Sequence, residues 1–224
     1  MPIPPILITN QGRWPSDVEL WLVNVDLRKS DAEIGGFLSE NEHKRMARFV
    51  RRDDRARFKF ARSTLRKILG RRLACDPARL EFEVGAYGRP SLIGHPRVSF
   101  NVSHSGERIL IGVSMHRTVG VDIEVENAAL EWRTLLDSVC VPEEVPHILD
   151  AVDFYKCWTA KEALLKATGL GIGVDSGLKS IDLASRRMPA GLNFNWLNEI
   201  DGYAAAVAFG TDADISAAPA RALR

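Results

Sequence analysis

The chain has 224 residues, of which 46% are hydrophobic and 26% are charged. This composition excludes an intrinsically disordered chain, and the length suits one large domain or two small ones. No apolar run approaches the roughly 18–20 residues of a membrane span, and the Pro-rich start lacks the pattern of a secretory leader. The three cysteines are isolated and lack metal-ligand spacing. We therefore expect a cytoplasmic protein with reduced thiols and no membrane partner.

The net charge of +1 conceals an uneven distribution of charge. Residues 44–72 contain 13 lysines and arginines but two acidic residues, so this segment carries +11 and the rest of the chain −10. A basic segment of this kind indicates either a polyanionic partner or a solvated helix face. The acidic remainder disfavours the wrapping of long DNA but is compatible with a compact anion such as a nucleotide.

Hydrophobic periodicity and turn residues predict the elements in chain order. In the first half we expect a helix that begins after Ser39, a longer helix closed by Gly70, a turn at 85–90, and strands over 18–25, 80–84, 98–102 and 109–115. In the second half we expect helices over 132–139 and 154–168, strands over 119–125, 192–196 and 203–209, and a frayed tail over 211–224. Because strands and helices alternate irregularly, the predicted fold class is α+β.

Segment 119–125, Val-Gly-Val-Asp-Ile-Glu-Val, alternates small or aliphatic residues with two carboxylates. In a strand, the aliphatic side chains would face the core, and Asp122 and Glu124 would lie together on the other face, about 6–7 Å apart. One interpretation is the polar outer face of an edge strand. The other is a Mg²⁺ site, because this cation takes one or two carboxylates and completes its shell with water and phosphate oxygens.

The predicted helix over 154–168 carries a second candidate group. Trp158, Glu162 and Lys166 are spaced by four residues and therefore share one face of the helix. They are either an exposed Glu–Lys pair beside a packing tryptophan, or a functional group. In the functional interpretation, Glu162 is a third metal ligand or a general base, and Lys166 is a phosphate ligand.

A third candidate group lies in segment 100–106, Phe-Asn-Val-Ser-His-Ser-Gly. We expect a strand followed by a turn at Ser103, His104 and Ser105. Hydroxyls, an imidazole and free backbone N–H groups at such a turn can bind an anion. The alternative is that the two serines simply cap the turn.

Together with Tyr87-Gly88-Arg89-Pro90, these segments resemble, in order and spacing, the 4′-phosphopantetheinyl transferases of the long, surfactin-synthetase-activating type. The resemblance covers residues 38–173. It implies Mg²⁺-dependent transfer of 4′-phosphopantetheine from coenzyme A to a serine of an acyl or peptidyl carrier protein, with release of 3′,5′-ADP. It also implies a monomer with two similar α+β halves, residues 1–117 and 118–224, that are related by a pseudo-twofold axis and enclose the active site in the cleft between them.

The resemblance also assigns roles to individual residues. Asp122, Glu124 and Glu162 would hold Mg²⁺, and the catalytic group would be Asp122, Glu162 and Lys166. Glu162 is the favoured base, with His104 as the alternative. The side chains implied to bind coenzyme A are those of Arg45, Arg48, Arg57, Arg89, Pro90, Ser103, His104 and Lys166.

Two positions depart from the family pattern. Glu42 stands where a basic coenzyme contact is expected, and the aromatic pair expected before Glu144, in the region where carrier proteins dock, is missing.

Two other functions also remain open from the residues alone. One is a non-enzymatic module that binds a polyanion or nucleic acid, although recognisable nucleic-acid motifs are missing and no stable nucleic-acid partner is expected. The other is a Mg²⁺-dependent coenzyme A pyrophosphohydrolase, in which water replaces the carrier serine.

Overall fold

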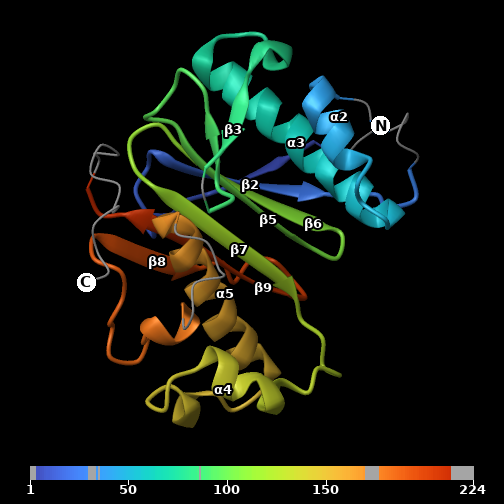
Figure 1. Cartoon of the computed structure of the whole chain (residues 1–224). Helices are drawn as coiled ribbons and strands as arrows, with labels where there is room; N and C mark the ends of the chain where they lie inside the picture. The colour runs from blue at the N-terminus through green and yellow to red at the C-terminus, as the bar shows by residue number, and fades with distance from the viewer. Residues whose placement is uncertain (1–3, 30–33, 35, 86, 170–176, 213–224) are drawn as a thin grey trace.

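The computed structural model describes residues 4–29, 34, 36–85, 87–169 and 177–212. Its first sheet is antiparallel, and its strand order is β1 (Ile6–Ile8), β2 (Val18–Asn24), β6 (Arg108–Ser114) and β5 (Ser99–Ser105). Helices α2 (Glu40–Met46) and α3 (Arg52–Leu73) lie beside this sheet (Figure 1). A short 3₁₀ turn (Pro77–Arg79) then leads into a hairpin of β3 (Phe82–Val84) and β4 (Pro90–Leu92).

The second sheet has the order β7 (Val119–Val125), β9 (Tyr203–Gly210) and β8 (Leu192–Trp196). Helix α5 (Ala151–Thr168) packs across β7 and β9 (Figure 1). The short elements around it are α4 (Leu136–Val139) and the 3₁₀ turns Trp132–Leu135, Val145–His147 and Leu178–Ser180. Mixed helices and sheets agree with the predicted α+β class. Among the described residues, no helix has both the length and the apolarity that crossing a bilayer requires.

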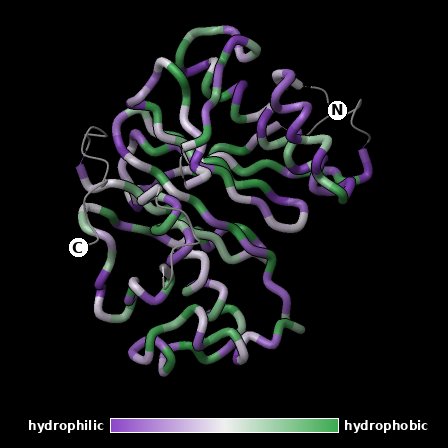
Figure 2. The backbone as a smooth tube through the Cα atoms, in the orientation of Figure 1, coloured by the Kyte–Doolittle hydropathy of each residue, from purple (hydrophilic) through white to green (hydrophobic). Residues whose placement is uncertain are grey.

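Among the described residues, three of the four apolar cores lie between successive layers of helix and sheet. The first core packs α3 on the first sheet through Leu65, Leu69 and Ile111. The second joins residues of both sheets, including Leu110 and Val121. The third packs α5 on the second sheet through small and aliphatic side chains, namely Ala160, Ala163, Leu164, Ala206 and Ala208. Hydrophobic stretches run along the central strands, and hydrophilic ones gather on the outer helices (Figure 2). Small residues in the third core allow α5 to lie close to its sheet.

Strands β5 and β7 run side by side and join the two sheets through polar side chains. The Ser99 hydroxyl accepts a hydrogen bond from the N–H of Val119 at 3.0 Å, and the Asn101 amide oxygen accepts one from Val121 at 3.0 Å. Further along, the Ser105 hydroxyl accepts one from the N–H of Val125 at 3.1 Å. Side chains at alternate positions of β5 therefore satisfy the backbone donors of β7, as a strand partner otherwise would.

Several boundaries differ from the predicted ones. Helix α3 continues past Gly70 to Leu73 and ends at Ala74 in the left-handed conformation (φ 51°). Gly70 is instead a point of close approach, because a Cβ there would lie 2.9 Å from the carbonyl oxygen of Cys75. The predicted turn at Ser103–Ser105 is wrong: β5 continues through Ser105, and these residues pair with β6. Strands β1 and β4 were not predicted, and α5 begins three residues before Phe154. Most of the predicted frayed tail lies outside the described residues.

Candidate active site

Asp122, Lys166 and Ser103 meet where β5, β7 and α5 converge. The Lys166 ammonium lies 2.5 Å from Asp122 Oδ1 and donates a hydrogen bond to the Ser103 hydroxyl at 3.2 Å. That hydroxyl in turn donates to Asp122 Oδ1 at 2.7 Å. Three elements that are distant in sequence thus supply one hydrogen-bonded group, and it contains two of the predicted catalytic residues, Asp122 and Lys166.

Gly120 explains how a helix can cover the carboxylate face of β7. Gly120, Asp122 and Glu124 share one face of the strand, because side chains alternate along it. A Cβ on Gly120 would lie 2.2 Å from the Ala163 carbonyl oxygen and 2.5 Å from the Ala167 nitrogen. Helix α5 therefore approaches β7 on the same face. Although β7 is an edge strand of its sheet, the expected solvent-exposed polar face is wrong at Asp122, which is only 2% exposed.

Two of the predicted metal ligands have a buried carboxylate oxygen that lacks a hydrogen-bond partner among the described residues. These oxygens are Asp122 Oδ2 and Glu162 Oε2. Burial raises the pKa of Glu162, and the negative charge of Asp122 raises it further. Burial likewise raises the pKa of Glu124, whose carboxylate accepts a hydrogen bond from Ser105 at 2.8 Å. Buried acceptors without donors cost free energy. Their chemistry fits a hard cation such as Mg²⁺, which binds through oxygen.

The three carboxylates do not form a closed metal cage in this conformation. Among the described residues, one group of three candidate ligand atoms lies within 4.8 Å of one another, and it consists of Cys140, Glu144 and Cys157. At the candidate site, the Lys166 ammonium neutralises Asp122. A cation shared by all three carboxylates would therefore require the longer glutamate side chains to turn toward Asp122.

A cavity of about 340 Å³ lies between α2, α3 and β5. It contains three of the predicted coenzyme contacts, Arg45, Pro90 and His104, together with the aromatic rings of Phe58 and Phe100. The Arg45 guanidinium lies 5.6 Å from the centre of the Phe58 ring. Partial burial lowers the pKa of His104, and the charges of Arg57 and Lys166 lower it further. The pocket therefore combines ring faces with cationic groups, as suits a nucleotide.

The remaining predicted coenzyme contacts lie in different surroundings. Arg57 donates to the carbonyl oxygen of Gly106 at 2.8 Å, beside the β5–β6 turn, and pairs with Asp54 at 2.9 Å. Arg48 is exposed and lines neither this pocket nor the neighbouring one. The structure thus gathers Arg45, Pro90 and His104 around one cavity and Ser103 and Lys166 around Asp122, but it does not bring Arg48 to either group.

Family models match both halves of the chain. The model of the 4′-phosphopantetheinyl transferase superfamily matches residues 118–208, and the model of the N-terminal part of 4′-phosphopantetheinyl transferases matches residues 30–116. The 4′-phosphopantetheinyl transferase HetI of Nostoc sp. is 32% identical over 75% of this chain and 74% of its own length. The chain belongs to the 4′-phosphopantetheinyl transferase family.

Other relatives agree with this assignment. A putative 4′-phosphopantetheinyl transferase of Synechocystis sp. is 38% identical, over 69% of this chain and 65% of that protein. The 4′-phosphopantetheinyl transferase Sfp of Bacillus subtilis is 24% identical, over 62% of this chain and 63% of its own length. This transferase is therefore an enzyme of the class that the motif order predicts.

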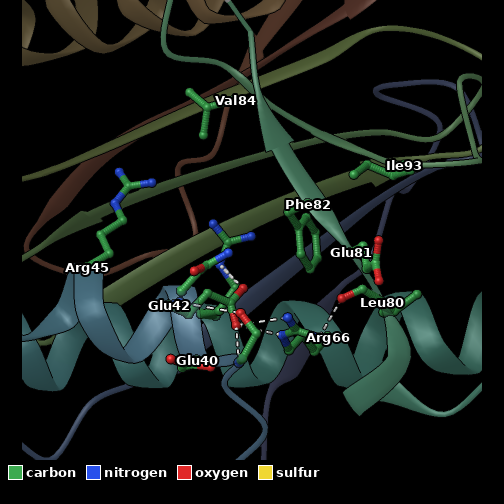
Figure 3. A pocket seen from close by; sticks show the side chains of 12 residues that line it. Glu40, Glu42, Arg45, Arg66, Leu80, Glu81, Phe82, Val84 and Ile93 are labelled. Carbon is green, nitrogen blue, oxygen red and sulfur yellow. Dashed lines mark hydrogen bonds and ion pairs between the residues drawn. The ribbon is translucent and has the colours of Figure 1, made fainter.

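In this transferase, Glu42 stands where the family pattern has a basic coenzyme contact. Glu42 lines a second cavity, of about 500 Å³ (Figure 3). Glu42 Oε2 accepts from Arg66 Nε at 3.0 Å, and Oε1 lies 3.2 Å from Arg62 Nε. Arg66 is 1% exposed and Arg62 is partly buried, so Glu42 serves as a counter-ion for both. Both arginines belong to the basic segment 44–72, but no local pattern could predict their pairing with an acidic residue of another helix.

Arg62 is a candidate coenzyme contact that sequence reasoning missed. It lines both cavities together with Arg45, and its Nη1 is buried without a hydrogen-bond partner among the described residues. Burial lowers its pKa, and the neighbouring charges of Arg45 and Arg66 act in the same direction. An anion in the smaller cavity would satisfy this donor and offset the excess of positive charge.

Arg89, predicted to bind the coenzyme, links the end of α5 to β5 and β7. Its Nη1 donates to the carbonyl oxygens of Lys166 and Ala167 at 2.8 and 2.7 Å. Its Nη2 donates to the Ser99 hydroxyl at 2.9 Å and to the carbonyl oxygen of Val119 at 3.0 Å. The guanidinium thus caps the C-terminal end of α5 and holds it against β5 and β7, so its implied contact with the coenzyme stays a prediction.

Replacing Arg89 with alanine is expected to lower the free energy of unfolding by about 2–3 kcal/mol, because charged hydrogen bonds to partly buried carbonyls are lost. For a chain of this length, that corresponds to a fall in Tm of about 6 °C. Thermal unfolding followed by circular dichroism would measure it, with Arg48→Ala as an exposed control that shifts Tm little. Equal Tm values for both variants would contradict the capping role.

Proposed function

We propose that this transferase moves 4′-phosphopantetheine from coenzyme A to the serine hydroxyl of an acyl or peptidyl carrier protein, with Mg²⁺ as cofactor and 3′,5′-ADP as leaving group. The observation that carries the proposal is the ion pair of Asp122 on β7 with Lys166 on α5, which lies close enough to Glu162 for their charges to interact; a cavity that combines cations and aromatic rings lies on β5, and His104 of its lining follows Ser103. Phosphoryl transfer relies on positioning and on electrostatic stabilisation, and this arrangement offers both.

In the proposed reaction, the carrier serine oxygen forms a bond to the β-phosphorus, and the bond from that phosphorus to the bridging oxygen breaks. Mg²⁺ held by Asp122, Glu124 and Glu162 would offset negative charge on the pyrophosphate. Lys166 would donate to a phosphate oxygen once it leaves Asp122. Arg45, Arg62 and His104 would hold the nucleotide end of coenzyme A in the aromatic cavity, with Arg57 beside its rim.

The serine proton needs an acceptor. Glu162 suits this role because burial raises its pKa, which makes its carboxylate a better base than an ordinary glutamate. His104 is the alternative, because its lowered pKa leaves the imidazole neutral and able to accept a proton. Its place in the coenzyme cavity favours a contact to phosphate over one to the reacting serine.

We further propose that residues 1–117 and 118–224 are two pseudo-twofold-related halves of a monomeric, long-type enzyme with its active site between them. Two separate family matches, which end at residue 116 and begin at residue 118, support this division. The β5–β7 contact would then hold the halves together.

The proposal is tested by incubating the chain with coenzyme A, Mg²⁺ and several apo-carrier proteins and recording intact masses. The expected result is one added phosphopantetheine group on a carrier serine, with release of 3′,5′-ADP. Release of 3′,5′-ADP without a carrier protein would favour a pyrophosphohydrolase instead. Salt-sensitive binding of nucleic acid without any carrier modification would favour a polyanion-binding module.

The raised pKa values of Glu162 and Glu124 predict the acid limb of the pH profile. Because both groups must be ionised to bind a cation, kcat/KM is expected to fall with decreasing pH already above the usual glutamate range. Saturating Mg²⁺ should move this limb to lower pH, since the cation stabilises the ionised carboxylates. Initial rates at limiting and saturating Mg²⁺ would measure the shift. An acid limb at the same pH in both series would mean that these carboxylates do not bind the metal.

A further inference from the structure

A second cluster of potential ligands lies between the end of α4 and helix α5, among residues that the proposed reaction does not use. Cys140 ends α4, Cys157 lies in the second turn of α5, and Glu144 lies between them in the chain. One ligand atom from each of the three lies within 4.8 Å of the others. All three side chains are buried, and the cysteines are only 3% and 5% exposed.

We propose that Cys140, Cys157 and Glu144 form a binding site for a thiophilic divalent cation such as Zn²⁺. The two sulfur atoms lie 3.8 Å apart. Two cysteine sulfurs on a tetrahedral zinc, each at about 2.3 Å from the metal, are about 3.8 Å apart, whereas sulfurs in a disulfide are about 2.05 Å apart. The spacing of the thiols therefore suits a shared zinc without movement of the backbone.

The charges around the cluster balance when the metal binds. The Lys161 ammonium lies 2.5 Å from Glu144 Oε2 and is fully buried. Thiolates on both cysteines and the Glu144 carboxylate carry three negative charges, which a divalent cation and Lys161 neutralise together. Glu144 Oε1 accepts a hydrogen bond only from the Leu183 N–H among the described residues, at 2.7 Å, and so keeps a lone pair for the metal.

A route for the metal leads to the cluster from the surface. Glu144 and Cys157 line a cavity of about 230 Å³, together with His147, Lys156 and Trp196. His147 belongs to the exposed 3₁₀ turn Val145–His147 and lines the same cavity, but its ring lies outside the cluster, so it would have to turn inward to supply a fourth ligand. Cysteine, histidine and carboxylate groups are the side chains that zinc uses in proteins. The bound metal would fasten the segment 139–147 to α5.

The test is equilibrium dialysis of the full chain against Zn²⁺ in excess Mg²⁺, with bound zinc measured by mass spectrometry. The expected result is one zinc per chain for the unchanged protein and for Cys75→Ser, whose cysteine is exposed and lies outside the cluster. Cys140→Ser and Cys157→Ser should each bind at least about 100-fold more weakly, since loss of an outer-shell partner alone costs roughly 10–100-fold.

Alkylation of the unchanged protein tests the site without a substitution. Zn²⁺ is expected to slow modification of Cys140 and Cys157 but not of Cys75, as measured by peptide mass spectrometry. Equal rates with and without Zn²⁺, no thiol-dependent zinc uptake, or an isolated protein with a Cys140–Cys157 disulfide would each overturn the proposal. Because Mg²⁺-dependent transfer uses other residues, a zinc-stripped chain that still modifies a carrier protein separates failure of this site from failure of the proposed reaction.

Discussion

Replacing Asp122 with alanine is expected to lower kcat/KM for coenzyme A by about 10³-fold or more while the protein stays folded. Asp122 is the point at which Lys166 and the Ser103 hydroxyl meet, and its second oxygen is buried without a partner among the described residues. The substitution removes a metal ligand and leaves Lys166 without its counter-ion. Lys166 is partly exposed, so water can solvate its ammonium and the cost in stability stays small.

Steady-state rates of carrier modification at varied coenzyme A concentration would measure the effect, and Tm would show that the variant is folded. Glu131→Ala is a suitable control, because Glu131 is an exposed carboxylate outside the site. Glu162→Gln should lose activity to a similar extent, since it keeps the shape of the side chain but removes its charge. Near-normal turnover by either the Asp122 or the Glu162 variant would contradict the proposed active site.

Local patterns predicted those parts of the fold that depend on neighbouring residues. The alternation in 119–125 correctly located β7, and Ser39 caps α2 in a reciprocal arrangement with Glu42. Gly169, in the left-handed conformation (φ 74°), ends α5 directly after the predicted helix 154–168. These features arise from backbone periodicity and from caps, which act over a few residues and can therefore be recognised in the sequence.

Contacts between distant segments could not be predicted in the same way. Ser99, Asn101 and Ser105 bond to backbone groups about 20 positions away in sequence, and no local pattern distinguishes such serines from turn residues. The need for glycine at position 120 could not be predicted either, because it arises only from the close packing of α5 on β7. The three carboxylates could be proposed as one group because the order of the family motifs implied it, not because their spacing required it.

Arg89 shows how a motif residue can acquire another task. The Gly-Arg-Pro pattern implied a coenzyme contact, but the guanidinium reaches the end of α5 and bonds to two of its carbonyl oxygens. The last turn of a helix has carbonyls without internal partners, and an arginine is well suited to bind them. A motif therefore indicates the position of a residue in the fold, whereas the contacts of its side chain depend on the elements that pack around it.

Replacing Lys161 with methionine is expected to lower the free energy of unfolding by about 3 kcal/mol or more, which corresponds to a fall in Tm of roughly 8 °C. Lys161 is fully buried, donates to the carbonyl oxygen of Val139 at 2.8 Å, and pairs with Glu144 at 2.5 Å. Without the ammonium, Glu144 keeps the N–H donors of Val141 and Leu183 but remains a buried charge without a counter-ion.

The matched control is Lys156→Met, five residues earlier on α5, where the lysine is only half-buried and the expected change in Tm is small. Thermal unfolding of a double variant, Lys161→Met with Glu144→Gln, distinguishes this explanation from simple loss of packing. The double variant should lose less stability than Lys161→Met alone, because it no longer contains the uncompensated charge. An equal or larger deficit would mean that Lys161 stabilises the fold through its aliphatic stem rather than through the ion pair.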